Sequence, residues 1–384
     1  MSSFIIPTTV QTATSGTYVP TILKRVEYGI GSLAKLADIL RDLSISKPLI
    51  ITGNSLATKT DVIEQVKKAA NCQISGVFSS IKQHAPVEDI KKCVNELKES
   101  KCDGIIGVGG GSPIDAAKIV ISFYKEETGI LLKLISIPTT LSAAELTILA
   151  GYTNEEGKKV GKKASEIGSS ALILDANLSL STPNRLWLST GIRALDHCVE
   201  QQYRPNAPLP VRVLAREGAG SLFESLRACH RNPKDVEARQ RALIGAWLSL
   251  WSDDLIGPIG PSHAVGYQLG APYSIPHGIC SCLTLARTVE IQAKHLPDNE
   301  VKQLASLLPF ITTTTTQSSN DSREQAMKVA EAIDKLIADL DLTSTLREYK
   351  VPQSDFQGIA ERALPDGKAD SRYDAFVKLL HTIY

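Results

Sequence analysis

Three consecutive glycines between a β-branched run and a helical segment are the part of this sequence best suited to bind an anion. The run at residues 105–108 is typical of a buried strand, and the glycines occupy residues 109–111. Ser112 and Pro113 follow, as the N-cap residue and first-turn proline of a helix. Such a turn presents free backbone N–H groups and the positive end of a helix dipole. The pattern therefore predicts a phosphate or pyrophosphate site, because a flexible Gly/Ser linker would not be flanked by a strand and a capped helix.

Three of the seven histidines form a second candidate for chemistry. His197 lies in the helical stretch TGIRALDHCVEQ, and His263 and His277 lie in the segment GPSHAVGYQLGAPYSIPHG. Imidazoles can bind a metal ion or act as acid and base, and the residues alone leave both roles open. The other histidines are expected in ordinary packing or surface positions: His84, His230, His295 and His381.

The spacing of apolar residues indicates the elements that must position these side chains. Candidate strands alternate with helical segments as far as residue 140, and the clearest strands are at residues 48–52, 105–108 and 131–137. Shorter strands are expected to start near residue 26, to end at residue 78 and to span 171–175. Alternation of this kind predicts a parallel, doubly wound (Rossmann-like) sheet with helices on both faces.

The second half of the sequence has long helical segments and no clear strand alternation. The predicted helices are residues 184–203, 211–229, 236–251, 279–293, 323–340 and 374–382. We therefore expect a flexible tail at residues 1–20, a nucleotide-binding α/β domain at 21–183 and an all-helical substrate and catalytic domain at 184–384.

Composition excludes several classes of partner. The formal net charge is +1, so there is no electrostatic basis for binding nucleic acid or an anionic membrane. No apolar run approaches the roughly 20 residues that span a bilayer. The seven cysteines are scattered without zinc-type spacing, and the first residues do not resemble a secretory signal. We expect a cytoplasmic protein whose partner is a small molecule.

Four ordered segments resemble the iron-containing alcohol dehydrogenase superfamily. They are GGGS with Asp115 and Lys118, PTT with Glu145, and the two histidine segments. The resemblance implies a nucleotide-binding α/β domain joined to an all-helical metal domain, the dehydroquinate synthase-like architecture. It also implies an NAD(P)-dependent dehydrogenase or reductase that forms a homodimer. The closest branch is maleylacetate reductase, to which these segments are similar: residues 84–88, 138–147, 241–248 and 269–277.

The sequence departs from the family at its metal site. The family has an aspartate four residues before the first histidine, and here that position is Arg193. A guanidinium beside the histidines would repel a divalent ion, so we expect no catalytic metal; if one were bound, its ligands would be His197, His263 and His277. The maleylacetate reductase branch also lacks the aspartate and works without metal, although its usual replacement is not arginine. Asp196 points about 100° away around the helix. Glu200 is one turn after His197 and could reach inward, although we expect it to support the site from outside the ligand positions or to be structural.

Arg193 could supply the positive charge that a metal ion would otherwise provide. It could stabilise a developing alkoxide or bind a substrate carboxylate through two hydrogen bonds. The alternative is that Arg193 is an ordinary surface residue of an amphipathic helix. At the family's other histidine position stands Tyr267, which is a weak acid unless nearby cations lower its pKa. The predicted catalytic residues are therefore Arg193, His197, His263, Tyr267 and His277, with His263 or His277 as proton donor.

One position bears on cofactor choice. After the strand at residues 48–52, many relatives carry an acidic residue that binds the adenosine ribose, and here Gly53 and Asn54 follow instead. Nothing at this point would repel NADPH, so we expect NADP to be accepted, with NAD as the alternative. The predicted nucleotide contacts are Gly53, Asn54, Gly109, Gly110, Gly111, Ser112, Asp115, Thr139, Thr140 and Leu141.

These observations lead to one functional expectation and two alternatives. We expect an NAD(P)H-dependent reductase of a carbonyl or enone compound, with an oxo-acid as one substrate class. A metal-dependent alcohol dehydrogenase with an altered ligand set is the first alternative. The second is a non-redox enzyme or nucleotide binder on the same fold, as in the sugar-phosphate cyclases related to dehydroquinate synthase.

Overall fold

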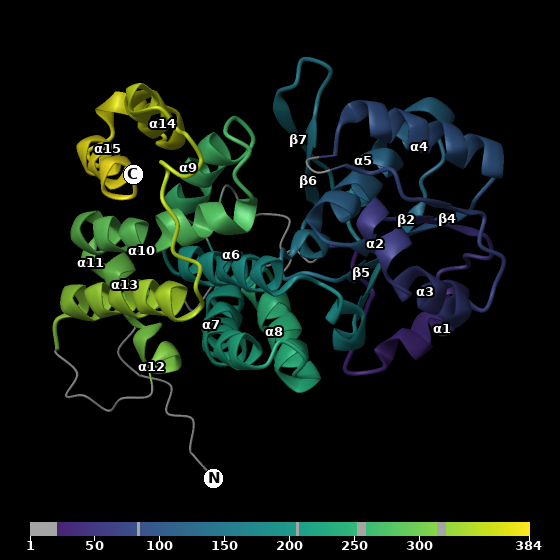
Figure 1. Ribbon diagram of the computed structural model, residues 1–384, viewed down its shortest axis with the longest axis horizontal. Coiled ribbons are helices and arrows are strands. Elements are labelled where there is room, and N and C mark those ends of the chain that lie inside the picture. Colours follow the sequence, from purple (N-terminus) through teal and green to yellow (C-terminus); the bar gives the residue numbers. More distant parts are fainter. Residues whose placement is uncertain (1–20, 83–84, 205–206, 252–258, 313–319) are drawn as a thin grey trace, which may run out of the picture.

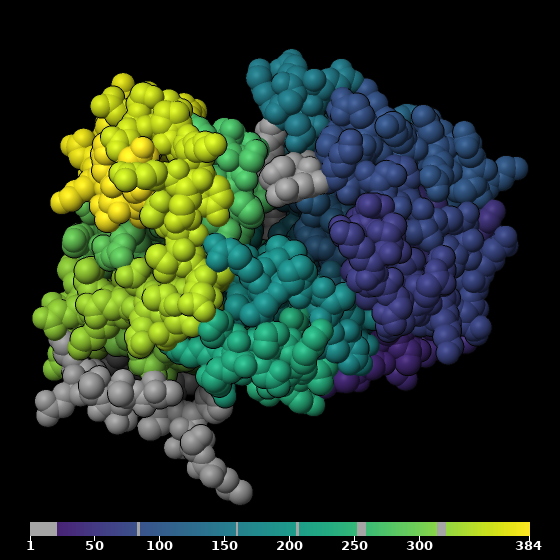
Figure 2. All heavy atoms as spheres, in the orientation of Figure 1, coloured from purple at the N-terminus to yellow at the C-terminus, as the bar shows by residue number. Residues whose placement is uncertain are grey.

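The computed structural model describes residues 21–82, 85–204, 207–251, 259–312 and 320–384. The predicted tail at residues 1–20 lies outside these ranges. An α/β lobe, which ends with the last strand of the main sheet, lies beside a helical lobe, which begins with α6 (Figure 1). The two lobes fill opposite sides of the molecule in the space-filling view (Figure 2). The predicted fold class is confirmed.

Six parallel strands form the main sheet, in the order β1-β8-β5-β4-β2-β3. Their bounds are β1 Arg25–Tyr28, β2 Pro48–Ile51, β3 Gly76–Phe78, β4 Gly104–Gly109, β5 Lys133–Pro138 and β8 Ala171–Leu174. The chain runs outward from β2 to β3 in one direction and from β4 through β5 in the other. The carboxyl ends of β2 and β4 therefore flank the point where ligands bind in doubly wound sheets.

Helices cover both faces of this sheet, as its buried strands require. They are α1 Leu36–Asp42, α2 Asn54–Lys59, α3 Val62–Ala70, α4 Val87–Ser100 and α5 Gly111–Thr128. Adjacent strand residues point to opposite faces, so Ile105 belongs to the core that includes Ile119 of α5, and Ile106 belongs to the core that includes Ile39 of α1.

An antiparallel hairpin was not predicted. It consists of β6 Leu149–Thr153 and β7 Lys159–Lys163, and it projects from the lobe in Figure 1. Its strands are short, and only β7 is largely polar, so neither shows a clear hydrophobic alternation. Gly157, with φ 75°, lies in the turn between them. Lys162 forms an ion pair with Glu126 and is thus a surface residue of this hairpin.

The helical lobe contains the long helices that the sequence predicts, with bounds shifted by up to two residues, and additional shorter ones. The bounds are α6 Asn184–Tyr203, α7 Leu209–Arg231, α8 Val236–Ser249, α9 Pro261–Gly270, α10 His277–His295, α11 Asp298–Ala305, α12 Leu308–Ile311, α13 Ser322–Asp339, α14 Phe356–Ala363 and α15 Tyr373–Thr382. Among the described helices, none is long and apolar enough to cross a membrane.

Helix α6 is the centre of this lobe and packs against α7, α8, α10 and α11. Its apolar side chains share one core with Leu172 and Leu174 of β8 and with Leu141 after β5. The two lobes are therefore joined by a continuous hydrophobic core rather than by a linker alone.

Candidate active site

The glycine turn between β4 and α5 is packed closely against the loop that follows β5. Gly109 has φ 135°, which only glycine adopts readily. A Cβ atom on Gly110 would lie 3.1 Å from Thr140 Cγ2, and one on Gly111 would lie 3.2 Å from Ser142 Oγ. Glycine at residues 110 and 111 therefore lets the loop after β5 pack closely against the turn.

The structure corrects the predicted start of α5. Gly110 is the N-cap residue, and Ser112 lies inside the first turn. The sharp backbone turn at Gly109 starts the helix two residues earlier than the preference of serine for N-caps predicts. The N-terminal N–H groups of α5 remain the positive end of its dipole, and the buried hydroxyls of Thr140 and Ser142 have no hydrogen-bond partner among the described residues. These groups could bind an anionic ligand.

The other predicted nucleotide residues occupy two different environments. Gly53 is the N-cap of α2 at the carboxyl end of β2 and forms a bridge with Ser80, so Gly53 and Asn54 border the same opening as the glycine turn. Asp115 Oδ2 accepts a hydrogen bond from Gly151 N–H at 3.4 Å, and its Oδ1 lies 3.7 Å from Lys118 Nζ. Asp115 thus holds the hairpin against α5, which is a supporting position.

One hydrogen bond attaches the nucleotide loop to the helical lobe: Leu141 N–H donates to Thr190 Oγ1 of α6 at 3.1 Å. Thr182, which lies just before α6, donates from Oγ1 to Thr139 O of the same loop at 2.7 Å. The start of α10 also meets α6 here, because a Cβ on Gly278 would lie 2.6 Å from the backbone of Ser189. The nucleotide loop, α6 and the end of α10 that carries His277 therefore converge.

Four of the predicted catalytic side chains form two neighbouring pairs. The rings of His197 and His263 stack with centroids 4.7 Å apart, and those of Tyr267 and His277 meet edge to face at 6.3 Å. His263 and Tyr267 are one turn apart on α9, so the two pairs are adjacent, and α6, α9 and α10 pack against one another. Tyr267 is 43% exposed and can contact a solute.

Arg193 is the fifth predicted residue and lies one turn before His197 on α6. Between Trp187 and Tyr203, every residue of this helix is buried except Arg193. The helix is therefore central rather than amphipathic, and Arg193 is half-buried, with its charge close enough to His197 to lower the pKa of that imidazole.

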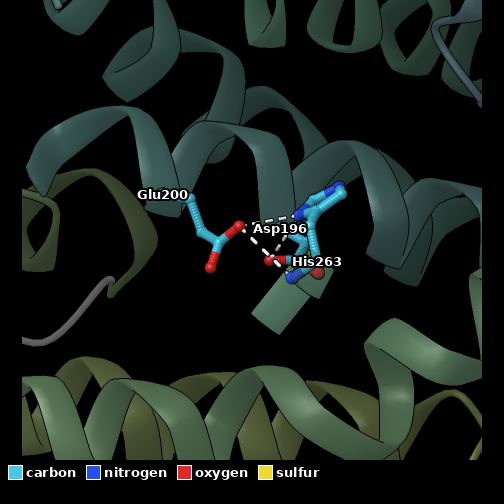
Figure 3. A group of neighbouring side chains, drawn as sticks. All are labelled: Asp196, Glu200 and His263. Atoms are coloured by element: carbon cyan, nitrogen blue, oxygen red, sulfur yellow. Dashed lines mark hydrogen bonds and ion pairs between the residues drawn. The ribbon is translucent and has the colours of Figure 1, made fainter. Parts of the chain in front are cut away.

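Sequence reasoning did not identify Asp196 and Glu200 as partners of a predicted catalytic residue. Glu200 Oε2 lies 2.7 Å from His263 Nδ1, and Asp196 Oδ1 lies 3.4 Å from the same atom (Figure 3). Both carboxylates are buried. Their four-residue spacing places them on one face of α6, which was the available signal, but α9 had to be placed before their common partner was known.

These contacts shift the pKa values of the two stacked histidines in opposite directions. Burial holds the pKa of His197 well below its usual range, and the positive charges of His263, Arg193 and Arg204 lower it further. The ring of His197 is therefore neutral. Burial alone would lower the pKa of His263, but Asp196 and Glu200 raise it above its usual range. Burial and Asp196 raise the pKa of Glu200, against the hydrogen bond from His263. The proton of this cluster is therefore held close to His263.

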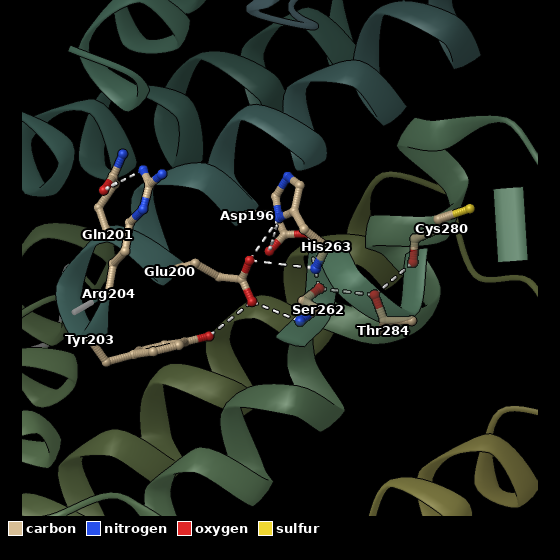
Figure 4. A network of polar contacts seen from close by, with 9 residues as sticks. All are labelled: Asp196, Glu200, Gln201, Tyr203, Arg204, Ser262, His263, Cys280 and Thr284. Atoms are coloured by element: carbon tan, nitrogen blue, oxygen red, sulfur yellow. Dashed lines mark hydrogen bonds and ion pairs between the residues drawn. The ribbon is translucent and has the colours of Figure 1, made fainter. Parts of the chain in front are cut away.

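The family resemblance raises the question of whether these residues suit a divalent metal ion. The donor atoms of Asp196, Glu200 and His263 lie within 4.8 Å of one another, as ligands of a cation would. Glu200 is bonded to His263, and Asp196 Oδ2 to Ser262, whereas Asp196 Oδ1 and His263 Nε2 have no hydrogen-bond partner among the described residues (Figure 4). Against a cation, the positive potential of Arg193 opposes protonation of both His197 and His263. A divalent ion would meet the same potential. The residues present fit such an ion poorly.

Two family models match most of the chain. "Iron-containing alcohol dehydrogenase" matches residues 24–176, and "Fe-containing alcohol dehydrogenase family, C-terminal" matches residues 187–379. The chain is 28% identical to maleylacetate reductase of Pseudomonas aeruginosa over 276 residues, which are 71% of this chain and 75% of the relative.

Two further comparisons extend over more of the chain. It is 28% identical to Dehydrogenase ALT3 of Alternaria alternata over 360 residues, covering 83% of this chain and 92% of the relative. The crystal structure of maleylacetate reductase from Rhizobium sp. strain MTP-10005 matches with a TM-score of 0.81 at 24% identity, covering 97% of this chain and 98% of that one. At that identity the structural match supports the fold.

Proposed function

The chain belongs to the iron-containing alcohol dehydrogenase family and is an NAD(P)-dependent oxidoreductase, and we propose that it reduces a carboxylate-bearing carbonyl or enone compound without a catalytic metal ion. The proposal rests on the position and the partial exposure of Arg193. It occupies the position of the family's metal-binding aspartate, and it is the one residue from Trp187 to Tyr203 on central helix α6 that is not buried.

The proposed reaction divides the work among the chain's own residues. The bound reduced nicotinamide supplies a hydride to the substrate carbon. Arg193 binds the substrate carboxylate and stabilises the negative charge that develops on the oxygen. His263, whose pKa is raised, provides the proton that converts the alkoxide to a hydroxyl group. His197, Tyr267 and His277 shape the opening between the nucleotide loop and α9.

The residues that follow β2 favour NADPH as the hydride source, with NADH as the alternative. No carboxylate follows β2 at residues 53–55, so a 2′-phosphate would meet no negative charge there. The pyrophosphate would lie at the glycine turn, within reach of the α5 N-terminus and the hydroxyls of Thr140 and Ser142.

We also propose that the boundary between the domains lies at residues 183–184 and that the protein is a homodimer. Strand β1 is at the end of the sheet, and Tyr28 at its end is 58% exposed. Its outer edge pairs with no other described strand and is a surface that a second copy could cover. Light scattering on the purified protein would measure the mass of the particle, and a monomer would contradict the dimer.

The test is a comparison of substrates that differ in one carboxylate. Oxidation of NADPH, and separately of NADH, is followed by absorbance with maleylacetate and keto acids, and with ketones and aldehydes that lack the carboxylate. Since a charge-assisted hydrogen bond contributes ~1.5–3 kcal/mol, we expect kcat/KM to favour the acids by about 10- to 100-fold. Arg193→Ala should remove this preference and lower turnover while nucleotide affinity is unchanged.

The control is Arg227→Ala, which removes an arginine of α7 that pairs with Asp339 away from the site. It should behave as the wild type does. Equal rates with neutral carbonyls, or a preference that survives Arg193→Ala, would contradict the role of Arg193. Tight nucleotide binding without oxidation by any carbonyl would favour the non-redox alternative.

A further inference from the structure

The connection between the two lobes, residues 175–183, is held in place by helix α8. Its first part is a short 3₁₀-helix, Ala176–Ser179. Gln240 of α8 is 64 residues from Ala176 in the sequence, and its Oε1 accepts a hydrogen bond from Ala176 N–H at 3.1 Å. Both residues are buried. The start of the connection is therefore fixed by a helix that comes much later in the chain.

Arg239 of α8 holds the end of this 3₁₀-helix. Its side chain is buried, with 1% of the residue exposed. Nη1 donates to Ser179 O at 2.5 Å, Nε donates to Pro233 O at 2.9 Å, and the guanidinium lies over the ring of Trp187 with Cζ 4.5 Å from the centroid. These partners are all neutral. Because a buried charge is costly unless its hydrogen bonds are kept, Arg239 holds the Ser179 carbonyl in one position.

Thr182 carries the connection onward to the nucleotide loop. Its N–H donates to the same Ser179 O at 2.9 Å, and its Oγ1 donates to Thr139 O at 2.7 Å. Thr139 N–H in turn donates to Gly109 O, in the glycine turn, at 2.9 Å. Both threonines are buried. The backbone of Thr139 is therefore bonded to the connection on one side and to the glycine turn on the other.

The position of Thr139 decides how the next residue meets the glycine turn. Thr140 Cγ2 is so close to the turn that a Cβ on Gly110 would lie 3.1 Å from it. The Thr140 hydroxyl and the N-terminal N–H groups of α5 are the groups to which we assign the pyrophosphate. A loop that lost its bond to Thr182 would change the separation of these groups, and a pyrophosphate would then bind less tightly.

We propose that Thr182 is a positioning residue for the nucleotide, which fixes the loop after β5 against the glycine turn, and that Arg239 holds Thr182 in place through Ser179. This inference rests on the proposed place of the pyrophosphate. Neither Thr182 nor Arg239 contacts the nucleotide in this account. The affinity of the α/β lobe for its coenzyme therefore depends on the connection between the lobes and on a buried cation of α8.

The first test is Thr182→Val, which keeps the shape of the side chain and removes the donor to Thr139 O. Calorimetry measures the Kd of NADPH and, separately, of NADH. Since a neutral hydrogen bond is lost, we expect both Kd values to rise by about 3- to 10-fold, and equally, because both coenzymes carry the pyrophosphate. At saturating NADPH, kcat should change less than about twofold, as for a group that acts only on binding. Thr182→Ser keeps the donor and should restore the wild-type Kd.

The matched control is Thr128→Val. Thr128 Oγ1 also donates to a backbone carbonyl, that of Tyr124, at 2.7 Å, but at the far end of α5 from the glycine turn. Its loss should lower the unfolding temperature and leave the Kd of NADPH unchanged. Wild-type affinity in Thr182→Val, a loss confined to one coenzyme, or an equal loss in Thr182→Ser or Thr128→Val would overturn the positioning role.

A second pair of variants tests the part played by Arg239. Arg239→Lys keeps the charge but not the forked donor group, so we expect the Kd of NADPH to rise. If Arg239 acts through Thr182, the double variant Arg239→Lys/Thr182→Val should raise the Kd by less than the product of the two single effects. Effects that multiply would show that Arg239 does not act through Thr182. The Thr182 variants test the loop contact without this substitution.

Because the Kd is measured without a reaction, this inference can fail separately from the proposed function. If the wild type bound NADPH but oxidised it with no carbonyl compound, the proposed reduction would fail, and a weaker Kd in Thr182→Val would still support the positioning role. If the wild type reduced a keto acid and Thr182→Val bound NADPH as tightly, the proposed function would stand and the positioning role would be refuted.

Discussion

A single arginine changes the electrostatics of this active site. Arg193 places positive charge where the family's metal-binding site has an aspartate, and its potential acts on both His197 and His263. The two carboxylates of Asp196 and Glu200 offset that potential at His263 and not at His197. The pKa of one imidazole is therefore raised and that of the other is lowered, although their rings are stacked. A proton donor can operate in this way beside a cation that binds the substrate.

The buried carboxyl group of Glu145 should make the stability of the protein depend on pH. Glu145 lies in the loop after β5 and is 4% exposed, and its Oε2 has no hydrogen-bond partner among the described residues. Burial raises the pKa of Glu145 from 4.5 to about 7, although its own backbone N–H and Lys118 oppose the shift. The folded chain therefore binds this proton more tightly than the unfolded chain does. The resulting stability is fully present below pH 4.5 and is lost as the pH rises to about 7.

Replacement of the group should remove this dependence. In Glu145→Gln the side chain is neutral at every pH, so the free energy of unfolding should fall less between pH 5 and 8 than in the wild type. The difference between the two slopes should amount to at most roughly 3 kcal/mol, at 1.36 kcal/mol per pKa unit. Urea denaturation at several pH values measures it. Parallel curves for the two proteins would show that Glu145 does not titrate in this range.

At the scale of elements, the turn at β4–α5 could be predicted and the environment of α6 could not. Glycines that directly follow a β-branched run indicate a turn at the end of a strand, so the anion site can be predicted from residues that are adjacent in the sequence. Helix α6 was also predicted, but the burial of most of its residues depends on α7, α8 and α10, which come later in the chain. For the same reason the partners of His263 were missed: Asp196 and Glu200 lie more than 60 residues before it.

The crossing of α6 and α10 offers a test at this scale. In Gly278→Ala the new Cβ would lie 2.6 Å from the backbone of Ser189, so α10 would have to move away from α6. Overpacking of this kind costs about 1–3 kcal/mol, and His277 would move with the helix. We expect lower stability in urea and lower kcat.

The control for this crossing is Gly266→Ala on α9. Its Cβ would lie 3.4 Å from Cys280 Cβ, which is ordinary contact, and alanine favours a helix over glycine. Its stability should be equal to or above that of the wild type. If both variants were equally stable, the close contact of Gly278 would not limit the packing of the two helices.

At the scale of the molecule, the two lobes behave as one packed unit whose site lies where they meet. Leu141, Leu172 and Leu174 from the α/β lobe share a core with α6, and Gln240 of α8 donates to Leu174 O and accepts from Ala176 N–H. The fold class of each lobe can be predicted from the spacing of apolar residues and from the turn residues. The packing between the lobes, and thus the meeting of the nucleotide loop with Arg193, depends on long-range contacts that no local pattern encodes.

We propose that Arg193 and His263 together replace the catalytic metal ion of other family members. The most direct test of this replacement is the rate of NADPH oxidation, with the preferred keto acid, by protein purified and assayed in excess chelator, with the metal content of the same sample measured. We predict an undiminished rate without stoichiometric metal. A rate that is lost in chelator and restored by ferrous or zinc ion would contradict the account, because the Asp196–Glu200–His263 cluster or the histidines would then hold a catalytic ion.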